Sequence, residues 1–231
     1  MDFLDPAHIW EASTPQTITI LMLLLVMGVA SLYVGIERWV TFNKARAQSR
    51  DLAAALGEAL ADGSLNRALS TCQDPQYKFA YLGHLMEAGL KEVDERFDTF
   101  GVHSAERAME RRAVQEAADL KRGMNILATV GSTAPFVGLV GTIFGIINAF
   151  GAMAETGSGG LGAVSAGIAE ALVATAFGIF VALIGVWLFN YFNGRIEQIT
   201  NDITVSIQEF VDWCEKRIQA GLEPDATTQA K

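Results

Sequence analysis

One acidic side chain, Glu170, lies in the almost wholly apolar stretch GIAEALVATAFG, residues 167–178. A carboxylate in hydrocarbon is costly unless it is neutralised, paired or hydrated. A carboxyl group that exchanges between its protonated and ionised forms inside a membrane is therefore a candidate proton relay. The alternative is a protonated glutamate that hydrogen-bonds a neighbouring helix and acts as a fixed strut. The residue and its surroundings leave both interpretations open and favour the relay.

Two hydroxyl side chains, Thr142 and Thr175, lie in the apolar segments on either side of a short Gly/Ser-rich turn. A helical threonine usually returns its hydroxyl to a carbonyl three or four residues earlier, so spacing alone indicates packing. Small residues recur beside both threonines, and they let helix backbones approach closely in lipid. A proline in the earlier segment lacks a backbone N–H, which predicts a kink or a hydrated point. The positions assigned to helix packing and the kink are Pro135, Gly138, Gly141, Gly145 and Gly178.

The other chemistry-bearing residues indicate no enzyme, no cofactor and no metal. Cys72 and Cys214 lie far apart and the histidines are scattered, which favours neither a disulfide framework nor a zinc site. The glycine-rich run 131–145 lacks the GK[ST] ending of a phosphate-binding loop. The net charge of −9 argues against nucleic acid as a partner. Few oxygen ligands surround Glu170, which favours protons over sodium as the ion it would handle.

The distribution of charge predicts the elements that hold these residues. All 17 Lys and Arg fall within 38–122 and 195–231, so the run 123–194 has no basic residue and only two acids. That run has room for two membrane crossings with a turn between them. A third apolar stretch near the N-terminus is preceded by acids, whereas a signal peptide would have basic residues there. We therefore expect an all-α membrane protein with three transmembrane helices.

The basic residues also predict an orientation and a cytoplasmic region. They cluster after the first span, before the second and after the third, which places the N-terminus outside and the C-terminus inside. The cytoplasmic region is expected to be helical. A helix stop at Asp62 and Gly63 is followed by an N-cap residue, Ser64, and apolar residues recur at spacings of three and four in 104–125. We also expect the second and third spans to extend into this region as long helices. In chain order we expect a periplasmic segment 1–17, a span 18–36, a cytoplasmic helical region 37–123, a span 124–153, a periplasmic turn 154–163, a span 164–193, a cytoplasmic helix 194–220 and a disordered tail 221–231.

Two segments carry a family resemblance. APFVGLVGTIFGI, residues 134–146, and GIAEALVATAFGIFVA, residues 167–182, resemble the signature helices of the ExbB/TolQ/MotA family of proton-channel subunits. The order of one span, a cytoplasmic region and two further spans resembles the ExbB/TolQ branch. The MotA branch has four spans and a larger cytoplasmic region, so it fits less well.

The resemblance implies a function in the bacterial inner membrane. Family members form a homo-oligomeric, pentameric cage around the transmembrane helices of an ExbD/TolR-type single-span partner, whose Asp takes part in proton transfer. By position, Glu170 matches the family's acid in the third span, and Thr142 and Thr175 match its pore-lining threonines. Proton flow would drive a TonB- or TolA-like effector or gliding machinery, and the sequence leaves nutrient import, envelope maintenance and gliding motility open. A non-conducting membrane scaffold or assembly subunit, with Glu170 as a strut, is the alternative.

Overall fold

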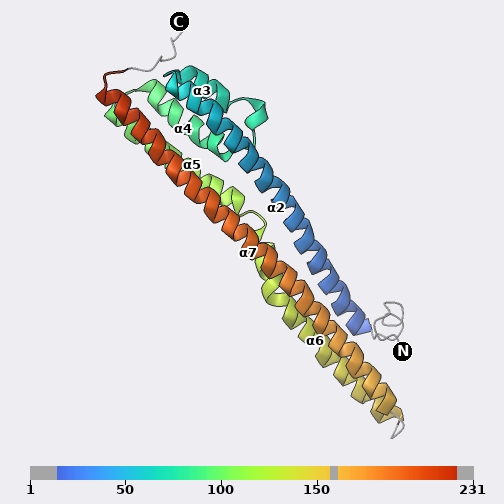
Figure 1. Cartoon of the computed structure of the whole chain (residues 1–231). Coiled ribbons are helices and arrows are strands. Elements are labelled where there is room, and N and C mark those ends of the chain that lie inside the picture. The colour runs from blue at the N-terminus through green and yellow to red at the C-terminus, as the bar shows by residue number, and fades with distance from the viewer. Residues whose placement is uncertain (1–14, 157–160, 223–231) are drawn as a thin grey trace. The chain divides into compact units, whose positions relative to one another are not determined.

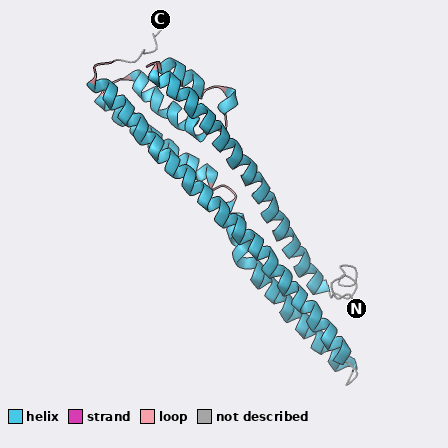
Figure 2. Ribbon diagram, viewed as in Figure 1, coloured by secondary structure: helices cyan, strands magenta, loops and turns pink. Residues whose placement is uncertain are grey.

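The computed structural model describes residues 15–156 and 161–222 of the 231-residue chain. Helices make up nearly all of these described ranges, and no strand occurs within them (Figure 2). The expected all-α class is therefore confirmed. The chain divides into two compact units. The first contains residues up to 36 and 123–191, and the second contains 37–122 and the residues from 192 onward.

The first unit is built from parts of three long helices, which are α2 (Pro15–Ala61), α6 (Met124–Thr156) and α7 (Leu161–Gln219). Each includes a segment long and apolar enough to cross a membrane, by length and composition. Within this unit α6 and α7 lie side by side (Figure 1). Side chains from all three helices form its buried core, namely Ile20, Leu24, Val130, Ala134, Val181 and Ala182.

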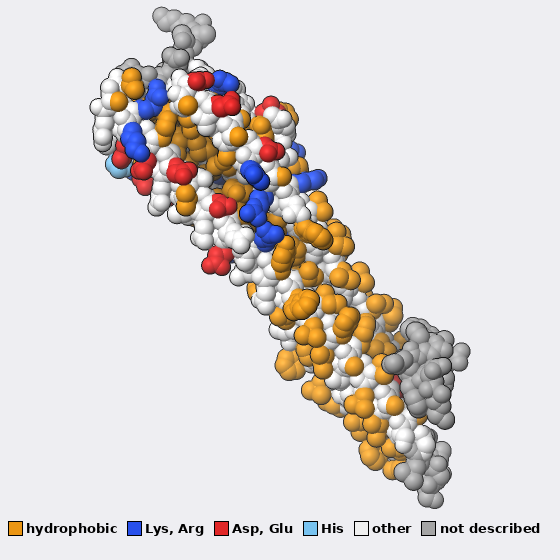
Figure 3. All heavy atoms as spheres, viewed as in Figure 1, with side chains coloured by type: hydrophobic (Ala, Val, Ile, Leu, Met, Phe, Trp, Pro, Cys, Tyr) orange, Lys and Arg blue, Asp and Glu red, His pale blue; other side chains and the backbone are white. Residues whose placement is uncertain are grey.

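The outer surface of the first unit is apolar. Phe136 on α6 is 67% exposed and Trp187 on α7 is 80% exposed, and on α2 the exposed apolar side chains include Val26 and Val29. Hydrophobic side chains, orange in Figure 3, dominate the visible surface of these segments. A soluble unit of this size would not expose so much apolar surface, so lipid or further protein covers it. The chain is a multi-pass membrane protein.

Shorter helices complete the second unit, and local sequence signals set their ends. Gly63 adopts a φ of +75° after α2, and the Ser64 side chain accepts a hydrogen bond from the Arg67 N–H at the start of the next helix. The predicted end of one helix and start of the next are confirmed here. The further elements are α3 (Leu65–Cys72), the 3-10 helix η1 (Pro75–Tyr77), α4 (Tyr81–Glu95) and α5 (Thr99–Leu120).

The connection into α6 differs from the sequence-based expectation of an amphipathic helix leading directly into the second span. A turn at residues 121–123 separates α5 from α6, and Gly123 has a φ of +77°. A left-handed residue ends a helix, and glycine adopts that conformation at little cost. By contrast, α7 continues without interruption to Gln219.

Several expected boundaries concern residues outside the described ranges. These are most of the segment 1–17, the central part of the turn 154–163, and the tail from 223 onward. Next to the N-terminal segment and the turn, the described residues are helical, since α2 begins at Pro15, α6 continues to Thr156 and α7 begins at Leu161. Residues 220–222, before the tail, are not helical.

Candidate functional site

The small residues of the two signature segments bring α6 and α7 into backbone contact. A Cβ added at Gly178 would lie 2.7 Å from the Ala134 carbonyl oxygen and 3.0 Å from Gly138 Cα. A Cβ at Gly145 would lie 2.7 Å from Ala171 Cβ. Only small residues permit this separation, which is the arrangement that stabilises helix pairs in lipid. The small faces of the two helices thus contact each other within one chain.

Two further sequence-predicted residues complete this helix pair. Gly141 faces Ala174, with a built Cβ 2.9 Å from Ala174 Cβ, and on its other side it approaches Ile20 of α2. Pro135 lies inside α6, where it removes one backbone donor. Ala134, the residue before it, contributes the carbonyl that Gly178 approaches.

The two predicted threonines meet across the α6–α7 contact. The Thr175 hydroxyl donates to the Gly138 carbonyl at 3.1 Å, and its oxygen lies 3.5 Å from the Thr142 hydroxyl oxygen. The Thr142 hydroxyl donates to the carbonyl of Leu139 in its own helix at 2.6 Å. Both hydroxyl protons are therefore committed to carbonyls, and each oxygen keeps lone pairs that can accept a further hydrogen bond.

The Glu170 side chain is partly buried in α7. Its Oε1 atom is buried and accepts no hydrogen bond from the part of the chain that the structure describes. A buried carboxylate oxygen without a partner is expensive when the group is charged. A partner for Glu170 Oε1 would come from beyond the described residues, such as from water or another chain.

The structure does not bring Glu170 together with the two threonines. Glu170 and Thr175 are five residues apart on a continuous helix, which turns them about 140° from one another. Thr175 faces α6, as its bond to Gly138 shows. The sequence motif therefore contains two polar positions on different sides of α7, and Glu170 is not joined to the threonine pair in a single chain.

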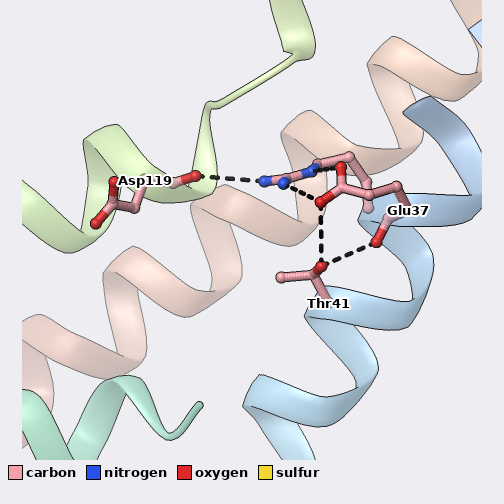
Figure 4. Close-up of polar contacts among 4 residues, drawn as sticks. Glu37, Thr41 and Asp119 are labelled. Carbon is pink, nitrogen blue, oxygen red and sulfur yellow. Dashed lines mark hydrogen bonds and ion pairs between the residues drawn. The ribbon is translucent and has the colours of Figure 1, made fainter. Parts of the chain in front are cut away.

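A polar cluster in the second unit was not predicted from the sequence. Two nitrogens of Arg38 donate to the Glu37 carboxylate at 2.5 and 2.6 Å, and a third donates to the Asp119 carbonyl at 3.3 Å. Figure 4 shows Glu37, Thr41 and Asp119 around this contact, in which the Thr41 hydroxyl donates to the Glu37 carbonyl at 2.9 Å. The hydrogen bond from Arg38 is the main cause that lowers the pKa of Glu37 from 4.5.

The Arg38 side chain is only 7% exposed, and its hydrogen bond to the Asp119 carbonyl joins the end of α5 to α2. Only one feature of the sequence points to this contact, a basic residue after an apolar span. The partner carbonyl is 81 positions away along the chain, beyond the reach of any local pattern.

A second buried group joins α4 to α5. The Glu116 Oε1 atom lies 2.8 Å from His84 Nδ1 and 2.6 Å from a nitrogen of Arg112. Burial raises the pKa of Glu116, but the hydrogen bonds and charges of His84 and Arg112 outweigh burial, and the net pKa is below 4.5. No group of three or more metal-ligating side chains occurs within the described residues.

The fold and this site define a class: a helical membrane protein with three apolar spans, a close glycine-mediated helix pair and a carboxyl group within the third span. Residues 78–204 match the family model described as the MotA/TolQ/ExbB proton channel family. The chain belongs to this family, as the sequence predicted. The family is one of proton channels, not of catalytic enzymes.

Similar proteins differ in how much of this chain they match. The Tol-Pal system protein TolQ of Pseudomonas aeruginosa is 32% identical over 216 residues, which cover 89% of this chain and 92% of that protein. The biopolymer transport protein ExbB of Xanthomonas campestris pv. campestris is 47% identical over 88 residues, covering 38% of this chain and 35% of that protein. ExbB of Salmonella typhimurium is 44% identical over 88 residues, or 38% and 36% of the two chains. The match to these ExbB proteins thus spans about a third of their length, whereas the match to TolQ spans nearly all of it.

Proposed function

We propose that this chain is an inner-membrane, stator-like proton-channel subunit that uses the proton-motive force to energise a process of the cell envelope. In this proposal Glu170 takes and releases the proton, and the Thr142–Thr175 pair supplies polar atoms at the α6–α7 contact. The driven process is of the type of TonB-dependent transport, Tol-Pal function or gliding motility. One charge that crosses 100 mV releases about 2.3 kcal/mol, so a few protons supply enough free energy to rearrange a packed helix interface.

The buried oxygen of Glu170 is the single observation that carries this proposal. If Glu170 were a structural strut, we would expect its carboxyl oxygens to accept hydrogen bonds, as the Glu116 carboxylate does in the second unit. Glu170 Oε1 is instead buried and has no partner among the described residues. A carboxyl group held in this way can gain or lose a proton without breaking a bond that the fold of the single chain depends on.

The proposed assembly includes further chains. The apolar side chains exposed on α2, α6 and α7 offer surface for lipid, for neighbouring copies in a homo-oligomer, which we propose is a pentamer, and for an ExbD/TolR-type single-span partner with an intramembrane Asp. The relatives' names, a biopolymer transport protein and a Tol-Pal system protein, support an envelope process that involves such partners. We further propose a periplasmic N-terminus and a cytoplasmic C-terminus, because the basic residues cluster at one side of all three spans.

The decisive experiment compares Glu170→Gln with Glu170→Ala in cells that depend on the protein and on its single-span partner. Gln keeps the volume and hydrogen-bonding capacity of the side chain but cannot exchange a proton. We expect both variants to reach the membrane and to co-purify with the partner. We also expect both to lose the proton-driven activity, and Glu170→Asp to retain part of it.

A scaffold without conduction predicts the opposite pattern. In that case Glu170→Gln would be silent, while Glu170→Ala would reduce the amount of assembled complex. Val205→Ala is the matched control, because Val205 is 51% exposed on the same helix, carries no ionisable group and belongs to the second unit and not to the apolar spans. Full proton-driven work by Glu170→Gln, measured beside this control, would exclude the proton-relay function.

A further inference from the structure

A small cationic hollow lies between α2 and α7 in the second unit, outside the membrane-spanning segments and apart from the residues discussed above. Its lining residues are Phe42, Asn43, Arg46, Arg195, Gln198 and Ile199. Its volume of about 20 Å³ admits one oxygen-sized group, and its mouth is open. The hollow could therefore accept one oxygen of a larger anion whose remaining atoms stay outside.

The two helices contribute the same kinds of side chain to this hollow. Asn43 and Arg46 are three residues apart on α2, and Arg195 and Gln198 are three residues apart on α7, so each pair shares one helix face. Each helix thus supplies one guanidinium group and one side-chain amide. The floor is apolar, because Phe42 and Ile199 are each 4% exposed and the Phe42 ring packs on Phe192 with centroids 5.5 Å apart.

The chemistry of this lining favours a phosphoryl group. Two guanidinium groups can each present paired N–H donors to phosphate oxygens, and the two amides add further donors. No carboxylate lines the hollow. On the same face of α7, Asp202 lies two turns beyond Arg195, and its carboxylate accepts a hydrogen bond of 3.4 Å from the Tyr81 hydroxyl. The lining residues thus include two cationic side chains and no anionic one.

The position of the hollow along the chain favours a lipid as the source of that phosphoryl group. The first and third spans end on the same side of the membrane, because the chain crosses once more between them. On α2 the run of exposed apolar side chains ends at Val40, six residues before Arg46. On α7 the run ends at Tyr191, four residues before Arg195, and the next exposed apolar side chain is Val205. Along both helices the apolar span comes first and the arginine follows it. Because helical side chains tilt toward the N-terminal end of their helix, both arginine side chains tilt toward the apolar span.

We infer that Arg46 and Arg195, with Asn43 and Gln198, form a binding site for the phosphodiester headgroup of an anionic phospholipid. In this site the headgroup joins α2 to α7 within the second unit, at the point along each helix that follows its apolar span. Basic sites between helices at the cytoplasmic membrane surface bind anionic lipid headgroups in this way. The inference does not depend on whether Glu170 conducts protons.

The test measures lipid retention by the purified full-length protein in detergent. Native mass spectrometry would count the phosphatidylglycerol and phosphatidylcholine molecules that remain bound across a titration with each lipid. We expect a preference for phosphatidylglycerol that falls roughly fivefold for Arg46→Gln and roughly 25-fold for Arg46→Gln with Arg195→Gln. The pair Arg107→Gln with Arg111→Gln removes the same charge from exposed positions on α5 and should leave the preference unchanged.

Three results would overturn the inference. The first is an unchanged lipid preference in the Arg46/Arg195 double variant, and the second is an equal loss in the α5 control, which would show a general charge effect. The third is displacement of phosphatidylglycerol by millimolar inorganic phosphate at constant ionic strength, which would assign the site to a soluble anion. If the double variant fails to fold, two single variants at the exposed Arg46 still test the inference. Arg46→Gln removes the charge, whereas Arg46→Lys preserves it and should retain most of the preference for phosphatidylglycerol.

Discussion

Replacement of Gly178 by alanine tests whether the α6–α7 contact depends on backbone proximity. The added Cβ would lie 2.7 Å from the Ala134 carbonyl oxygen and 3.0 Å from Gly138 Cα, whereas ordinary contact begins near 3.4 Å. Both neighbours are backbone atoms, which cannot rotate away as the end of a long side chain can. The two helices would therefore have to separate by several tenths of an ångström.

The cost follows from two opposing effects. Over-packing of a well-fitted contact costs about 1–3 kcal/mol. Alanine is more favourable than glycine within a helix by about 1 kcal/mol, which offsets part of that cost. We therefore expect the Gly178→Ala protein to lose up to about 2 kcal/mol of unfolding free energy. The separation also lengthens the 3.1 Å hydrogen bond from Thr175 to Gly138, one turn from the substituted residue.

A matched control is available on the same helix. A Cβ added at Gly194 meets nothing within 4 Å, so Gly194→Ala should stabilise α7 by about 0.5–1 kcal/mol. The free energy of unfolding of both variants would be measured in mixed micelles by titration with a denaturing detergent. If Gly178→Ala proves as stable as Gly194→Ala, the helices tolerate the extra methyl group, and the argument from backbone contact is wrong.

The remaining predictions concern three polar contacts. Thr175→Val should cost about 0.6 kcal/mol of unfolding free energy, because it removes the hydrogen bond to α6, while Thr175→Ser should cost less. The pKa of Glu116 is lower in the folded protein than its unfolded value of about 4.5. The ionised carboxylate therefore stabilises the fold fully above pH 4.5, and this stabilisation is lost as the pH falls through the folded pKa. Melting temperatures measured against pH should show this acid-dependent fall, and Glu116→Gln should flatten it. Glu37→Gln should lower the unfolding free energy by about 1–2 kcal/mol, because Arg38 then stays buried with a neutral partner. A melting temperature equal to that of the unmodified protein would contradict the assigned ion pair.

Local signals explain which parts of the fold the sequence predicted. Long runs without basic residues predicted three spans, since a charged side chain is costly near the centre of a bilayer. Gly63 and Ser64 identified a helix end and the next helix start, because capping depends on residues within one turn. The break before α6 had a comparable signal in Gly123, which follows two basic residues, Lys121 and Arg122, directly after α5. The apolar pattern on both sides of Gly123 led to the expectation of a continuous helix.

Contacts between distant segments could not be predicted in the same way. The spacing of small residues shows that a helix has a packing face, but it does not identify the helix that packs there. The structure pairs the face of α6 with that of α7 in the same chain. The contact between Arg38 and the Asp119 carbonyl likewise joins segments whose proximity follows only from the tertiary fold.

The relation between Glu170 and Thr175 shows the limit of motif-based reasoning most clearly. The two residues belong to one short motif, yet a five-residue separation on a helix turns them about 140° apart. Thr175 is hydrogen-bonded to α6 of its own chain, whereas Glu170 Oε1 is buried without a partner among the described residues. A proton path that uses both positions therefore needs atoms beyond the described residues, such as water, a neighbouring copy or the proposed single-span partner. For this reason the Glu170 variants discriminate between relay and strut in the assembled complex, and the isolated chain is the wrong preparation in which to test them.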